Sequence, residues 1–124
     1  MFKTIPLLLT DGTVKDFDFM AVGTTQYRYK QVFGKELMVG ISRLINQDLS
    51  TIGEDADFSV IDKLAFIMNC QAEKKDLNKQ NLDTFLEWVE QFEPSSLLNN
   101  MNEIISIYIG NKASTSTPKK EVEP

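Results

Sequence analysis

The sequence contains no histidine and a single cysteine, so most side chains used for metal and nucleophilic chemistry are missing. Histidine is both the commonest general base and the commonest metal ligand. One cysteine cannot form an internal disulfide or a zinc site of familiar cysteine spacing. Cys70 stands in an apolar segment of helical character, where a buried structural thiol is expected. Imidazole and thiol catalysis are therefore not expected.

Long apolar runs are also absent. No stretch approaches the roughly 18 consecutive apolar residues that a membrane-spanning helix requires. The apolar start at residues 1–9 is interrupted by Pro6 and followed by Asp11-Gly12 without a cleavage site of small residues, so a signal peptide is not expected. We therefore expect a soluble protein that is not exported.

Positive charge and phosphate-binding motifs are scarce. The net charge of −5 disfavours nucleic acid as the principal partner, because affinity for phosphates comes mainly from lysine and arginine. The motifs GxGxxG, GxxxxGK[ST] and GxSxG do not occur, and the six glycines do not cluster into a phosphate-binding loop. No nucleotide-binding loop is predicted.

Carboxylates are the remaining side chains that could support catalysis or bind a metal ion. Glu54, Asp55 and Asp57 form the densest group, but they lack the alternation and the central glycine of an EF-hand loop. A solvated loop ending in a helix cap at Asp57 is favoured. Asp16 and Asp18 share one strand face, for which exposure to solvent is favoured over a cation site. No catalytic, cofactor-binding or metal-binding residue is predicted, and a metal-dependent carboxylate enzyme stays an alternative.

The hydrophobic pattern indicates a β-hairpin at the start of the chain. Apolar arms flank Asp11-Gly12, a strong signal for a two-residue turn, so a hairpin is predicted over residues 2–19. In its second arm, Phe17 and Phe19 share one face while Asp16 and Asp18 lie on the other. The phenylalanine face is expected to pack on helices, because a lone hairpin is marginal in water.

Apolar residues at three- and four-residue spacing predict helices over the rest of the domain. The predicted helices span about 24–34, 36–47, 57–73, 81–92 and 95–109. A threonine cap, Gly34, Asn81 and Pro94 mark their ends. Residues 111–124 have almost no large apolar side chain and are expected to be a disordered tail. The predicted fold class is mainly α (α+β), with the hairpin packed on a bundle of about five helices in a single domain over residues 1–110.

Aromatic residues and methionines on these helices are the candidates for contact with another protein. The predicted apolar face of the fourth helix contains Leu82, Phe85, Leu86, Val89 and Phe92, with Trp88 on its shoulder. Large aromatic side chains and adaptable methionines serve either a core or an interface, and both alternatives stay open. The candidate partner-binding residues are Tyr27, Tyr29, Phe33, Met38, Met68, Trp88, Phe92 and Met101.

Basic residues alternate with aromatic ones in the first helix. Arg28, Lys30 and Lys35 lie among tyrosines and Phe33, a pattern that binds single-stranded nucleic acid by stacking in some proteins. The solvent-exposed face of an amphipathic helix gives the same pattern and is favoured. A small helical regulatory or nucleic-acid-binding protein remains an alternative, and its binding should weaken steeply as salt rises.

The order of these segments resembles a known family, the small tail assembly chaperones of long-tailed, siphovirus-type bacteriophages, especially those of Gram-positive hosts. Residues 27–38 are similar to the family's helix rich in tyrosine or arginine, its Phe-Gly break and its restart with an acidic residue and leucine. This stretch follows a hairpin built around Asp-Gly. Residues 83–89 resemble the family's acidic-aromatic helix, and residues 104–108 lead into a polar tail that contains lysine.

The resemblance implies a function in virion assembly. Members of the family escort the tape measure protein until tail tube subunits polymerise around it, and they are absent from the finished particle. The family also implies a longer form made by ribosomal frameshifting, a homo-oligomer as one possible assembly, and the host cytoplasm as the location. The family brings no active site with it, and the residues themselves predict no cofactor, nucleic acid or membrane as a partner. A structural tail or head–tail connector component of the particle is the nearest alternative.

Overall fold

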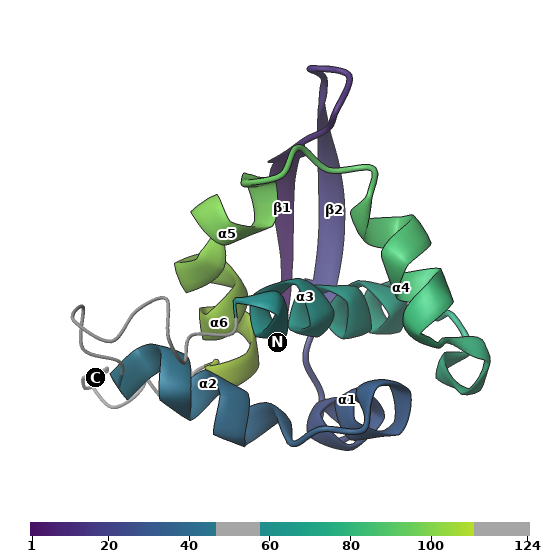
Figure 1. Cartoon of the computed structure of the whole chain (residues 1–124), viewed down its shortest axis with the longest axis vertical. Coiled ribbons are helices and arrows are strands. Elements are labelled where there is room, and N and C mark those ends of the chain that lie inside the picture. Colours follow the sequence, from purple (N-terminus) through teal and green to yellow (C-terminus); the bar gives the residue numbers. More distant parts are fainter. Residues whose placement is uncertain (47–57, 111–124) are drawn as a thin grey trace, which may run out of the picture.

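The hairpin is the only sheet among the residues that the computed structural model describes, which are 1–46 and 58–110. Strands β1 (Phe2–Leu8) and β2 (Val14–Met20) pair antiparallel, with Ile5 opposite Phe17. Figure 1 shows the hairpin standing upright over a layer of helices. The side chains of Ile5, Leu7, Phe17 and Phe19 point into the core, as the alternation in the second arm predicted.

The turn of the hairpin is longer than predicted. The N–H of Leu9 donates to the carbonyl of Thr13 at 2.8 Å, which encloses a turn of three residues instead of two. Only Gly12 has a positive φ, of 88°, and Asp11 accepts hydrogen bonds from the main-chain N–H and the hydroxyl of Thr13. The two-residue turn is therefore wrong, because the Asp11 side chain fixes a wider loop that needs left-handed backbone at the glycine alone.

Helix α3 (Ser59–Ala72) is the centre of the fold. It crosses the hairpin in Figure 1 and packs against β2, α1, α4, α5 and α6. Its residues from Val60 to Cys70 are buried on nearly every side, except Asp62 and Lys63. A helix that is apolar all round belongs in a core and not on a surface. The apolar stripe seen in the sequence thus understates the burial of this helix.

The other helices surround α3. They are α1 (Thr25–Phe33), α2 (Leu37–Asn46), the short 3₁₀-helix η2 (Leu77–Lys79), α4 (Leu82–Val89), α5 (Ser96–Asn99) and α6 (Met101–Ile109). The fold class is confirmed, since the molecule is mainly helical with an N-terminal antiparallel hairpin packed on the helices. The 3₁₀-helix was not predicted, although Asp76 caps it by accepting from the N–H of Asn78 at 2.9 Å.

Two predicted helix ends in the second half are wrong. Helix α4 stops at Val89 and not near residue 92, because Gln91 and Glu93 use their main-chain groups to pair with the hairpin. The predicted helix over 95–109 is divided into α5 and α6 at Asn100, whose side-chain amide donates to the carbonyl of Ser96 at 2.9 Å. In both places main-chain groups form hydrogen bonds with a side chain or with a distant segment in place of the regular hydrogen bonds of a helix.

The predicted caps have mixed outcomes. Asn81 caps α4 as predicted, accepting from the N–H of Thr84 at 3.0 Å, while the Thr84 hydroxyl accepts from the N–H of Asn81 at 2.9 Å. Neither Thr24 nor Thr25 forms the predicted cap, because Thr24 makes no side-chain capping hydrogen bond and Thr25 is already the first residue of α1. Gly34 ends α1 in the left-handed conformation, with φ of 74°, as predicted.

Some predictions fall outside the described residues. They are the carboxylate group of Glu54, Asp55 and Asp57, the ends of the second and third predicted helices that face it, and the disorder of residues 111–124.

Candidate partner-binding surface

Most of the candidate partner-binding residues lie in the core. The buried ones are Tyr29, Met68, Trp88 and Phe92. The partly buried ones, which pack against the same core, are Phe33 and Met101. A partner has no access to the four buried side chains in this conformation, so they do not enter the surface described below.

The buried aromatic side chains form a cluster that joins the hairpin to α1, α3 and α4. The ring of Phe92 lies with its centroid 5.0 Å from that of Phe17 in β2 and 4.8 Å from that of Trp88 in α4. At the other end of the cluster, Phe33 of α1 packs edge-on against Phe85 at 5.2 Å. Tilted and edge-to-face contacts of this kind stabilise a core beyond the area they bury.

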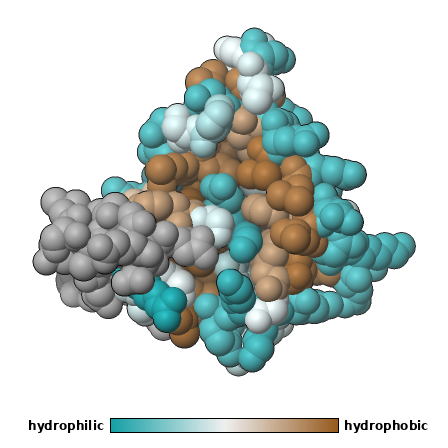
Figure 2. Space-filling view, in the orientation of Figure 1, coloured by the Kyte–Doolittle hydropathy of each residue, from teal (hydrophilic) through white to brown (hydrophobic). Residues whose placement is uncertain are grey.

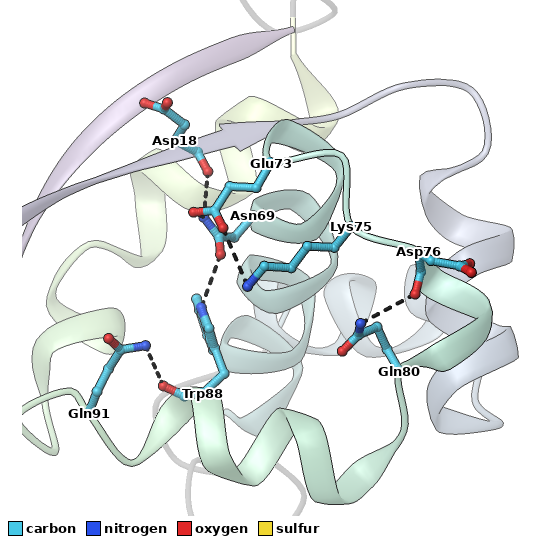
Figure 3. Close-up of polar contacts among 8 residues, drawn as sticks. All are labelled: Asp18, Asn69, Glu73, Lys75, Asp76, Gln80, Trp88 and Gln91. Carbon is cyan, nitrogen blue, oxygen red and sulfur yellow. Dashed lines mark hydrogen bonds and ion pairs between the residues drawn. The ribbon is translucent and has the colours of Figure 1, made fainter.

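One buried amide connects this aromatic cluster to three elements. Asn69 of α3 accepts a hydrogen bond from the indole N–H of Trp88 at 3.0 Å. Its own N–H₂ group donates to the carbonyl of Asp18 in β2 at 2.9 Å and to the carboxylate of Glu73 at 3.1 Å (Figure 3). A buried polar group with all its partners in place fixes the relative position of the elements that supply them.

The exposed candidates lie near the start of α1 and the start of α2. Tyr27 is 66% exposed and Met38 is 43% exposed, and neighbouring Val22 is 45% exposed. A hollow of about 330 Å³ opens among Val22, Gly23, Gln26, Met38, Tyr108 and Ile109. We call the hollow together with Tyr27 the α1–α2–α6 surface, and Figure 1 shows the last turn of α6 reaching α2 there. It brings together two of the predicted residues, Tyr27 and Met38.

Thr25 holds the start of α1 in place beneath this surface. Its hydroxyl accepts from the N–H of Val22 at 2.8 Å and donates to the side-chain carbonyl of Gln71 in α3 at 2.8 Å. Thr25 is fully buried, so both bonds are shielded from water. The chain that leads from β2 into α1 is therefore fixed to α3, which leaves Val22 and Tyr27 facing outward.

Tyr108 at this surface lies close enough to Tyr27 to be affected by it. Burial, and then the neighbouring phenol of Tyr27, raise the pKa of Tyr108 above its ordinary value. Tyr108 is therefore neutral at physiological pH. The six residues around the hollow carry no charged side chain, so the surface is apolar with hydroxyl and amide groups at its margin.

Sequence reasoning missed Val22, Tyr108 and Ile109, because nothing in the helical pattern brings the end of α6 to α1 and α2.

A second exposed apolar feature runs along α4. The predicted apolar face of this helix is wrong in part, because Leu82 and Leu86 are 53% and 49% exposed while Phe85 and Trp88 are buried. Figure 2 shows hydrophobic residues reaching the surface beside α4 among hydrophilic ones. Leu82 and Leu86 offer a matched control for substitutions on the α1–α2–α6 surface.

The described residues offer little for covalent or metal chemistry. They contain no group of three or more His, Cys, Asp or Glu side chains that could hold a metal ion. Cys70 is buried, and burial raises the pKa of its thiol to about 11, which keeps it protonated. Over residues 1–46 and 58–110, no helix is long and apolar enough to cross a membrane.

Comparison with known proteins identifies no relative, since no protein-family model, curated protein or solved structure matches this chain. The resemblance to tail assembly chaperones stays a prediction from the sequence.

Proposed function

We propose that this chain is a phage tail assembly chaperone that binds the tape measure protein through the α1–α2–α6 surface. The observation that supports binding at this surface is the grouping of exposed Val22, Tyr27 and Met38 around an uncharged hollow. Exposed apolar groups that gather around a concavity mark interaction sites more often than scattered ones do. The identity of the partner comes from the sequence resemblance of residues 27–38 and 83–89 to that family.

The chemistry of the surface suits a helical partner. A tape measure protein exposes apolar stripes along its helices before the tail tube encloses it, and such a stripe binds a shallow apolar groove through side chains at helical spacing. Met38 supplies a flexible contact that adapts to several such stripes, while Tyr27 and Tyr108 supply rigid area with polar tips. The tail tube protein, a frameshift-extended form of the chain and further copies of it are the other proposed partners, in the host cytoplasm and not in the mature virion.

The test is co-expression of the chain with the tape measure protein of its phage. The native chain is expected to keep the tape measure protein soluble and to co-purify with it. A double variant with Tyr27→Ser and Met38→Ser should lower the affinity at least roughly tenfold, because truncation of two interface anchors costs on the order of 1–2 kcal/mol each. A double variant with Leu82→Ser and Leu86→Ser is the matched control and should bind like the native chain.

Each result has a distinct meaning. Loss of binding in the α4 control, with binding kept in the Tyr27 and Met38 variant, would move the interface to α4. An insoluble tape measure protein with the native chain and with its frameshift-extended form would contradict the chaperone proposal. Stable incorporation into purified virions would favour a structural tail or connector component instead. Melting curves of both variants establish that they are folded.

A further inference from the structure

The outer edge of β2 is the strongest feature that the proposed function leaves unused. The N–H of Ala21 donates to the carbonyl of Met1, and the N–H of Leu9 donates to that of Thr13, each at 2.8 Å. These two pairs fix the register, so odd-numbered residues of the hairpin hydrogen-bond across it. The even-numbered residues of both strands therefore direct their N–H and C=O groups outward, one set along each edge.

The edge of β1 is closed over its second half. At Leu8 the N–H donates to the hydroxyl of Ser96 at 3.0 Å, and the carbonyl accepts from the N–H of Glu93 at 3.1 Å. Pro6, the next outward residue, has no N–H to offer. A partner strand therefore finds no continuous ladder along β1.

The edge of β2 is open over its first half. The carbonyl of Asp18 already accepts from Asn69, which closes the end of the strand near α3 (Figure 3). Across the described ranges, no hydrogen bond reaches the outward main-chain groups of Val14 or Asp16, and Val14 is 64% exposed. An unpaired edge of this kind is a template for an added strand.

The side chains beside this edge select its occupant. Asp16 and Asp18 point to the same outer face, and within the described part of the chain neither forms an ion pair. A second copy of β2 pairing there would bring aspartates next to aspartates, which is unfavourable. A strand with basic side chains at alternate positions would instead place one of them opposite Asp16, with the two Cβ atoms roughly 5 Å apart. We propose that the β2 edge, from Val14 to Asp16, binds an extended segment of another protein with lysine or arginine at alternate positions.

The test uses the full chain, labelled with ¹⁵N, and a synthetic peptide of about seven residues that alternates lysine with valine. The peptide should bind with amide shift changes centred on Val14 and Asp16. Two matched peptides separate the contribution of charge from that of main-chain hydrogen bonds. One has glutamate in place of lysine, and the other carries N-methyl groups on the amides that face the strand. Both should bind at least about tenfold more weakly, the first through charge repulsion and the second through loss of the ladder.

Variants complete the experiment. Asp16→Lys should weaken binding of the lysine peptide roughly tenfold, while the same charge change at Asp83, on the exposed first turn of α4, should leave it unchanged. Equal binding of the N-methylated peptide would show mere charge attraction and overturn the proposal. So would shifts confined to the α1–α2–α6 surface, the absence of binding at millimolar peptide, or self-association of the chain through β2. The result is independent of whether the tape measure protein binds.

Discussion

At the scale of single residues, the interior of this protein depends on one fully hydrogen-bonded amide. Asn69 is almost completely buried and has partners in β2, in α4 and at Glu73 directly after α3. Replacing one member of such a group leaves the others buried without partners, and that penalty exceeds the net gain of each hydrogen bond. The position therefore should tolerate substitution poorly, although nothing in the sequence distinguishes this asparagine from the exposed ones.

The first prediction concerns this amide. Asn69→Ala should lower the free energy of unfolding by about 2 kcal/mol, because the Trp88 indole N–H and the Asp18 carbonyl lose their partner. Urea unfolding followed by the fluorescence of Trp88, the single tryptophan, measures the change. Asn102→Ala on the exposed side of α6 is the control and should change stability by less than about 0.5 kcal/mol. Equal effects of the two substitutions would contradict the prediction.

The second prediction is a pH dependence at Asp62. Burial raises the pKa of Asp62 from 3.8 to about 6, and no charged partner compensates within the described residues. A raised pKa means that the folded state prefers the protonated carboxyl group. The stability from this group is therefore complete below about pH 4 and is lost as pH rises through 6.

Asp62→Asn should consequently stabilise the fold at neutral pH. The free energy of unfolding should rise by about 1 kcal/mol. This is less than the full pKa shift would give, because the carboxyl group is only half-buried and stays in contact with solvent. The gain should disappear below about pH 4, where the native carboxyl is protonated. Unfolding curves at several pH values measure it. A gain of equal size at low pH would assign the effect to the amide and not to the charge.

At the scale of elements, the approach of α2 to α3 depends on a glycine. A methyl group on Gly40 of α2 would overlap Cγ2 of Val60 in α3, and Val60 is buried. A β-branched side chain has one strongly preferred χ1 rotamer in a helix, so Val60 withdraws from this contact only at a cost. The sequence offered no sign of this contact, because a glycine inside a helical pattern reads only as a weak helix former.

Gly40→Ala tests this close approach. Alanine alone would favour the helix by about 1 kcal/mol, but overpacking against Val60 costs roughly 1–3 kcal/mol, so net destabilisation is expected. Adding Val60→Ala should remove the clash, and the two substitutions together should then cost less than the sum of each alone. Ser42→Ala on the exposed side of α2 is the control. Strict additivity in thermal melts would refute the contact.

The sequence predicted the presence of the helices better than their ends and their buried faces. The presence of α1 to α4 followed from spacing and caps, because Asn81 and Gly34 act locally through their own geometry. The end of α4 could not be predicted from spacing and caps, since it depends on pairing with a hairpin that lies far away in sequence. Periodicity also placed Leu82 and Leu86 on the buried face, because spacing identifies an apolar stripe but not which edge of the stripe the core covers.

At the scale of the whole molecule, the same limit applies to the candidate site. Aromatic residues and methionines were chosen as candidate partner contacts, but composition does not separate a core from an interface. The tertiary arrangement assigned Tyr29, Met68, Trp88 and Phe92 to the interior and left Tyr27 and Met38 outside. It also added Tyr108 from the far end of the chain, which no local pattern brings to α1 and α2.

Two methionines provide the final prediction, because the sequence treated them alike and the structure does not. Met68 has no exposed surface in α3, whereas Met38 is 43% exposed at the hollow. Met68→Ala should lower the free energy of unfolding by about 2–5 kcal/mol, through lost burial and the cavity that remains. Met38→Ala should change it by less than about 0.5 kcal/mol, since little burial is lost. Thermal and urea unfolding of the two variants measure these changes.

The same two variants behave in the opposite order toward a partner if the α1–α2–α6 surface is the interface. Met38→Ala should weaken binding of the tape measure protein while it leaves the fold intact, and Met68→Ala should retain binding at temperatures where it is still folded. A native-like affinity for Met38→Ala together with a reduced affinity for folded Met68→Ala would mean that the partner opens the core around α3. Binding would then use the buried stripe that the sequence first suggested, and the exposed hollow would have no part in it.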